Sequence, residues 1–199
     1  MPYKVFFCVP TGRAEFFVQR FYDKATCAAK PGDYCRARVQ AWAGPDKELE
    51  ANNRWPADTD PRWPKCCEAC GKEFAADASR STGSRTIVAR ADTGEEIDLC
   101  NAPVGACWDA SWYRDERAGP DGRRLIVKTP GGDWDIDSRA SNCTMPNDDA
   151  HRCWVRHGRP EDGTLNVDKN GNTCQAGAGS IICGNYHGFL RNGYLTDGC

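Results

Sequence analysis

The sequence predicts a mainly β protein with extensive loops, in which short β-hairpins are stapled by structural zinc and form up to two small subdomains. Two observations support the fold class: short runs of aromatic and β-branched residues alternate with turn residues, and 20 glycines and 12 prolines punctuate the chain. The 13 cysteines lie largely in clusters, which predicts the zinc. Hydrophobic residues make up only 40% of the chain, so a divided core needs extra cross-links.

Residues 1–80 are expected to form an N-terminal unit that consists of a hairpin and a zinc knuckle. Residues 3–9 and 14–22 are rich in aromatic and β-branched side chains, and Pro-Thr-Gly separates them, so the pattern predicts a β-hairpin. Residues 43–65 contain repeated X-Pro pairs, which disfavour a stable helix. This segment should be ordered only where its tryptophans are buried.

The strongest motif is a zinc knuckle at Cys67 and Cys70, which have the Cys-x-x-Cys spacing. Two intervening residues let both sulfurs turn toward one tetrahedral ion. Cys27 and Cys35 flank a compact loop and can supply the other two thiolates. Four thiolates close the coordination sphere, so the zinc would be structural. Two alternatives stay open: the thiols are ordinary buried cysteines, or Cys66 takes the place of Cys67.

Residues 85–199 are expected to form a cysteine-rich C-terminal β unit. A short helix is expected to present Trp108 and Trp112 together at i, i+4. Turn residues separate two further hairpins, and glycine-containing turns separate short strands after them. The hairpins pair 84–90 with 95–99 and 123–129 with 133–137, and the strands cover 152–157, 164–168 and 180–182.

The C-terminal unit contains a second candidate zinc site. Cys143, Cys153 and Cys174 would supply three thiolates, and His187 is the candidate fourth ligand. The spacings match no standard zinc template. Core thiols with satisfied partners, or a disulfide between two of these cysteines, are equally open interpretations.

A catalytic interpretation rests on the same residues. Cys153 or Cys174 could act as a nucleophile with His187 as the base and Asp135 or Asp137 as the orienting carboxylate. No local pattern distinguishes a nucleophile among so many thiols. The sequence also lacks the His-x-Glu of the zinc deaminases, a Walker A sequence, HExxH and Gly-x-Ser-x-Gly. We therefore expect a protein that is not an enzyme.

Charge and hydropathy restrict the partners and the compartment. The formal net charge is −2, and local arginine pairs lie beside acidic residues, so nucleic-acid binding is not expected. The apolar run at residues 5–9 is shorter than the roughly 7–15 residues of a secretory core region. No run approaches the ~18 apolar residues of a membrane span. We expect synthesis in a reducing cytoplasm, where clustered thiols more often bind metal than form disulfides.

A resemblance to a known family is carried by several phrases of the sequence, at residues 32–40, 60–64, 67–71, 134–143, 151–158, 176–181 and 186–190. Together these phrases resemble a family of cysteine-rich proteins encoded by tailed bacteriophages and their prophages. The resemblance covers most of the chain from the first cysteine loop onward. It implies a phage product that is translated in the host cytoplasm and built into the virion, and it carries over no activity.

The expected function is that of a non-enzymatic structural component of a tailed phage particle, either a capsid decoration or a minor virion protein. Its partners would be other virion proteins, and no small-molecule substrate is evident. One alternative is a zinc-ribbon-like adaptor that binds nucleic acid or a host protein, which requires a basic stripe and salt-dependent binding. Another is a Cys/His-dependent enzyme, which requires one thiol of unusual reactivity.

Overall fold

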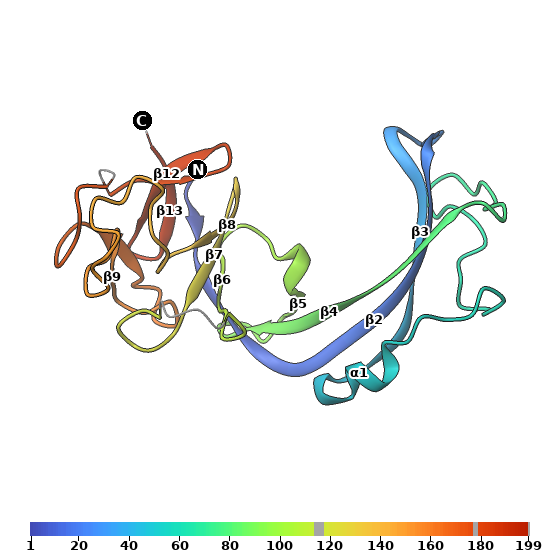
Figure 1. Ribbon diagram of the computed structural model, residues 1–199, viewed down its shortest axis with the longest axis horizontal. Coiled ribbons are helices and arrows are strands. Elements are labelled where there is room, and N and C mark those ends of the chain that lie inside the picture. Colours follow the sequence, from blue (N-terminus) through green and yellow to red (C-terminus); the bar gives the residue numbers. More distant parts are fainter. Residues whose placement is uncertain (114–117, 177–178, 199) are drawn as a thin grey trace. The chain divides into compact units, whose positions relative to one another are not determined.

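The computed structural model describes residues 1–113, 118–176 and 179–198, and these residues form a mainly β protein with long loops, as predicted (Figure 1). Their only helical segments are η1 (Asp46–Glu48), α1 (Leu49–Asn52) and η2 (Leu99–Asn101). The chain divides into two compact units. The hairpin unit comprises Pro10–Val88 and Asp98–Cys100, and the core unit comprises Met1–Val9, Ala89–Ile97 and Asn101–Cys199. The division therefore differs from the expected 1–80 and 85–199, because residues at the start of the chain join the core unit.

The hairpin unit is built on strands β2 (Phe6–Cys27) and β3 (Lys30–Pro45), which pair antiparallel, with β4 (Ser79–Arg90) beside β2 (Figure 1). The hairpin expected over residues 3–22 is wrong. Its supposed turn lies inside β2, which continues through Gly12 at a φ of +68° and reverses direction only after Cys27. β2 pairs with β6 at Phe6–Cys8 and with β3 from Arg13 to Cys27, and this long-range pairing on both sides of the supposed turn outweighs the local turn chemistry.

Two small clusters pack the hairpin unit. Phe16, Val18 and Trp63 are buried together, and the indole Nε1 of Trp63 donates to the Ala57 carbonyl at 2.9 Å. The other cluster contains cysteines together with Phe74 and small residues. The proline-rich segment is thus anchored where Trp63 is buried, whereas its other tryptophan, Trp55, is exposed and not part of these clusters.

The core unit contains most of the shorter strands. A four-stranded antiparallel sheet has the order β1-β13-β12-β11, β9 pairs with β10, and the start of β2 pairs parallel with β6, which continues through β7 to β8 (Figure 1). β5 (Glu96–Asp98) is the neighbour of β4. The remaining bounds are β1 (Tyr3–Lys4), β6 (Ala106–Asp109), β7 (Leu125–Thr129), β8 (Gly132–Asp135), β9 (Val155–His157), β10 (Asn166–Asp168), β11 (Ile181–Cys183), β12 (Tyr186–Arg191) and β13 (Tyr194–Asp197).

The two later hairpins are confirmed as β4–β5 and β7–β8, but the short helix expected around Trp108 is wrong. Trp108 lies in β6, where it is opposite Ile126 of β7 and Cys8 of β2. Pairing on both sides of β6 overrides the helical spacing of the tryptophans. The main core lies in this unit, and its fully buried members include Leu125, Ile136, Leu165, Ile181, Leu190 and Leu195.

A buried ionic network joins the loops of the core unit. The side chains of Arg156 and Asp137 are 4% and 3% exposed, and the Arg156 Nε lies 3.2 Å from the Asp137 carboxylate. The two Nη atoms of Arg156 donate to Asp121 at 2.7 and 3.1 Å. Burial opposes ionisation of Asp121, but hydrogen bonds from Arg156 and Arg123 hold its pKa well below its usual range. Arg156 is therefore the cation on which two carboxylates depend.

Replacing Arg156 with alanine should lower the free energy of unfolding by about 3–5 kcal/mol, because the buried Asp137 carboxylate loses its partner. Urea denaturation followed by circular dichroism measures the change. Arg159→Ala is the matched control, since Arg159 is 63% exposed and its ion pairs are 3.6 and 3.9 Å long. The control should change stability by less than about 1 kcal/mol. Equal effects of the two substitutions would contradict the assigned role of Arg156.

Candidate metal centres

The structure brings together Cys27, Cys35, Cys67 and Cys70, which we call the four-thiol centre. Cys27 ends β2 and Cys35 lies in β3, so the reversal between the two strands places their thiols near each other. The other two cysteines lie in a turn. All four sulfur atoms lie within 4.8 Å of one another.

The turn that carries Cys67 and Cys70 has the backbone of a knuckle. Gly71 N–H donates to the Cys67 carbonyl at 2.9 Å, and Gly71 has a φ of +72°, which favours glycine. The Cys67 N–H donates to the Lys72 carbonyl at 2.8 Å. An N–H from Glu68 to the Arg36 carbonyl of β3, at 3.1 Å, attaches the turn to the hairpin. These bonds hold the turn against the strand that carries Cys35.

The sulfur separations fit a tetrahedral metal site. The Sγ atoms of Cys27 and Cys67 are 3.9 Å apart, and those of Cys35 and Cys70 are 3.6 Å apart. Zn–S bonds of about 2.3 Å at tetrahedral angles give S···S edges of about 3.8 Å. A disulfide requires about 2.05 Å, and every cysteine that the structure describes is free. The geometry is therefore that of donors around one ion.

Electrostatics in the four-thiol centre favours a cation. Burial opposes ionisation of the Cys67 thiol, but hydrogen bonds from the backbone of Cys70, Ala69 and Arg36 lower its pKa to about 6. Burial and the neighbouring thiols of Cys70 and Cys27 raise the pKa of Cys35 to about 12. The Cys67 thiolate is thus stabilised by the protein alone, whereas ionisation of Cys35 would be favoured by a positive charge between the sulfurs.

The core unit holds a second group, the histidine centre, which consists of Cys143, His151, Cys153 and Cys174. His151 and Cys153 lie just before β9. Cys174 follows Thr173, which forms an isolated parallel bridge with Arg152 and so brings Cys174 beside Cys153. Cys143 lies in the turn closed by its own N–H and the Ala140 carbonyl at 3.1 Å.

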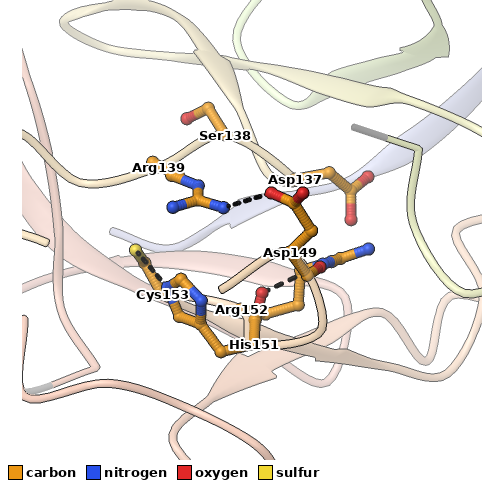
Figure 2. Close-up of a pocket in the computed structure, with 7 residues that line it drawn as sticks. All are labelled: Asp137, Ser138, Arg139, Asp149, His151, Arg152 and Cys153. Carbon is orange, nitrogen blue, oxygen red and sulfur yellow. Dashed lines mark hydrogen bonds and ion pairs between the residues drawn. The ribbon is translucent and has the colours of Figure 1, made fainter. Parts of the chain in front are cut away.

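The donor separations in the histidine centre also fit tetrahedral edges. His151 Nε2 lies 3.2 Å from the Cys143 Sγ and 3.8 Å from the Cys153 Sγ. The sulfurs of Cys153 and Cys174 are 3.6 Å apart. Figure 2 shows the His151 imidazole turned toward Cys153. Zinc bonded to sulfur and nitrogen at about 2.3 and 2.0–2.1 Å gives edges of about 3.5–3.8 Å.

The surroundings of His151 fix its orientation. Its Nδ1 is hydrogen-bonded to the Asp148 carbonyl, which leaves Nε2 facing the thiols. Arg139 donates to the same carbonyl at 2.9 Å and also bonds the carbonyls of Met145 and Pro146. His151 is only 2% exposed. Metal-binding histidines are typically oriented in this way, by a hydrogen bond from the second ring nitrogen to a carbonyl or carboxylate.

The histidine expected in this centre, His187, is not there, and His151 occupies its place. His187 lies on β12 opposite Ile182 and is exposed, whereas the preceding Tyr186 faces the core. Strand alternation therefore turns His187 outward. The closeness of His151 to Cys153 in sequence was the signal that could have identified it. The remaining members, Cys143, Cys153 and Cys174, are brought together as expected.

The constellation of the catalytic alternative is not assembled around His187, which is exposed on β12. The two carboxylates considered with it are engaged elsewhere, because Asp135 pairs with Arg124 and Asp137 pairs with Arg156. Burial raises the pKa of Cys153 to about 11. Besides the donors of the histidine centre, the side chains of Ala140, Met145, Trp154 and Ala176 pack against these thiols.

Comparison with known proteins adds no relative. No protein-family model, curated protein or solved structure matches the chain. In the part of the chain that the structure describes, no helix is long and apolar enough to span a membrane. The candidate metal centres are therefore the features from which a function can be argued.

Replacing Cys70 with alanine should remove one equivalent of bound metal and lower the melting temperature, because three donors remain in the four-thiol centre. Metal analysis of protein purified under reducing conditions, together with thermal melting, measures both effects. Cys66→Ala is the matched control, since Cys66 is exposed and lies outside the group. Loss of metal in Cys66→Ala but not in Cys70→Ala would refute the ligand assignment.

A second pair of substitutions tests the histidine centre. His151→Ala should also remove one equivalent of metal, because it deletes the only nitrogen donor in the group. His187→Ala should leave the metal content unchanged, since His187 is exposed on β12. The same metal analysis distinguishes them. Unchanged metal in His151→Ala would exclude this histidine as a ligand.

Proposed function

We propose that the protein is a non-enzymatic structural component of a tailed phage particle, a capsid decoration or minor virion protein, stabilised by zinc in both centres. One observation carries the non-enzymatic part: each centre offers four protein donors, which close a tetrahedral coordination sphere. A catalytic zinc keeps one position open for water or substrate. The resemblance to phage proteins supports the virion part.

Zinc is the ion that this donor chemistry favours. Thiolate and imidazole donors in a tetrahedral arrangement are typical of structural zinc, whereas calcium and magnesium take oxygen ligands. Tetrahedral thiolate sites also suit iron, so metal analysis decides between them. The N–H of Ala176 that points to the Cys174 sulfur at 3.4 Å resembles the hydrogen bonds that stabilise bound thiolates.

In both centres the metal would join segments that are distant in the sequence. In the hairpin unit it would tie the ends of β2 and β3 to the irregular segment that contains Cys67 and Cys70. In the core unit it would tie the turn at Cys143 to the loops that carry Cys153 and Cys174. Such cross-links give rigidity without a large core, which suits a small structural protein.

Exposed aromatic residues are in keeping with a protein that contacts partners. Trp55 is 59% exposed, and Trp112 and Tyr113 are 55% and 52% exposed. Large aromatic side chains often anchor protein interfaces. The described arginines largely pair with nearby acids, for example Arg90 with Asp92 at 2.9 Å, which does not favour the nucleic-acid-binding alternative.

Mass spectrometry of purified phage particles tests the virion proposal. The protein should be present at a reproducible copy number relative to the major capsid protein. Particles washed in high salt should retain the protein. A non-structural phage protein made at the same time is the control, and washing should remove it. Its absence from particles, with normal amounts in infected cells, would refute the proposal.

Removal of metal tests the structural role of zinc. A zinc chelator under reducing conditions should unfold the loops of both units, because structural zinc contributes apparent binding free energies of about 10–16 kcal/mol in small peptides. Circular dichroism and metal analysis follow the change, and added zinc should reverse it. Metal-free protein with unchanged melting would contradict the role. Salt-dependent binding to DNA or RNA would instead favour the adaptor alternative.

A further inference from the structure

We propose that a hollow in the core unit, beside the histidine centre, binds a neutral sugar ring. The hollow has a volume of about 330 Å³. Its lining combines the apolar side chains of Trp134, Trp154 and Ile182 with hydroxyl and amide side chains of residues 138–142. Small-molecule sites are typically hollows of about 300–1,000 Å³ with an apolar lining and few polar groups.

The aromatic part of the lining is held in place. The rings of Trp134 and Trp154 meet edge to face, with centroids 5.4 Å apart and planes at 87°. The Trp154 Nε1 donates to the Ser180 carbonyl at 3.1 Å, and Trp134 belongs to the main core. Ile182, beside them, is 72% exposed. A rigid aromatic surface of this kind can pack against the C–H face of a sugar ring, which is apolar.

The polar part of the lining offers uncharged hydrogen-bonding groups. Ser138 Oγ donates to the Asp135 carbonyl at 2.9 Å, which leaves its lone pairs able to accept hydrogen bonds. Ser141 and Asn142 are exposed, and their side chains make no hydrogen bond among the residues that the structure describes. A carboxamide and two hydroxyls suit the several hydroxyl groups of a sugar, which both donate and accept.

The charge in the hollow is already compensated. Among the lining residues that the structure describes, Arg139 is the one with an ionic side chain. Its guanidinium bonds backbone carbonyls in residues 145–148 and lies 2.8 Å from the Asp149 carboxylate. An anionic ligand would have to compete with these partners. The lining therefore favours a neutral polyhydroxyl ligand over a phosphate or a carboxylate.

The histidine centre would hold the walls of the hollow. Asn142 directly precedes the ligand Cys143, and Trp154 directly follows the ligand Cys153. Both sides of the hollow are thus carried by loops that the metal would join. In this respect the inference rests on the proposed zinc, and the metal content must be measured in the same samples.

Isothermal titration calorimetry with the metal-loaded protein tests the proposal, with glucose, galactose, mannose, rhamnose and N-acetylglucosamine as probes. At least one sugar should bind saturably. Trp154→Ala should weaken binding about tenfold or more, since the sugar ring loses the aromatic surface against which its apolar face packs. Asn142→Ala should also weaken binding of the same sugar, and it should not affect folding because Asn142 is exposed. Trp112→Ala is the control for a tryptophan outside the hollow and should not change binding.

No binding of any of the five sugars by fully metal-loaded protein would overturn the sugar site and leave the zinc proposal standing. Sugar binding by protein stripped of metal would support the site and overturn the role of the metal in holding its walls. Binding that Asn142→Ala and Trp154→Ala both leave unchanged would also overturn the site. Binding of an apolar fluorescent dye, without binding of any of the sugars, would identify an apolar ligand instead and overturn the proposal.

Discussion

Each of the two candidate metal centres brings four thiol or imidazole donors together, and the order of the surrounding loops depends on this convergence. The segments that supply the donors bury few large apolar side chains. Phe74 is the largest one around the four-thiol centre, and around the histidine centre only Cys153, Cys174 and Ala176 are buried hydrophobic members. Burial of so little apolar area offsets little of the entropy of fixing the backbone, about 1–2 kcal/mol per residue. A structural zinc contributes about as much as the whole stability of a domain, and so would decide whether these loops are ordered.

The four-thiol grouping could be predicted because each pair of donors is local in the sequence. Cys67 and Cys70 are separated by only two residues, and Cys27 and Cys35 flank a short reversal, so only one long-range contact had to be inferred. The histidine centre was harder. Its three cysteines were grouped correctly, but the choice between His151 and His187 depends on the register of β12, which turns His187 outward. No local pattern reports that register, because it is set by pairing with β11 and β13.

The same distinction between local signals and long-range pairing explains which parts of the fold could be predicted. The hairpins at β4–β5 and β7–β8 were predictable, because each is closed by a short turn with glycine at a positive φ, such as Gly94 or Gly132. Gly12 also has a positive φ, yet the chain does not reverse there. A glycine therefore shows where the backbone can bend, and long-range pairing decides whether it turns. Trp108 shows the same effect, since strands on both sides of β6 override its helical spacing.

Cross-linking through distant donors also permits long irregular segments. The entropy of closing a loop rises only slowly with its length, by about 0.6 kcal/mol for each doubling, so the chain between ligands can lengthen at little cost to stability. The features available for recognition lie on irregular chain of this kind. Trp55 lies in the irregular segment between the end of α1 at Asn52 and Cys67, and residues 138–142 directly precede Cys143. The donors would fix the ends of the loops, and the residues between them can vary. Recognition surfaces on these loops can therefore change without a change of fold. In this protein, the metal centres would thus make binding surfaces possible without forming them directly.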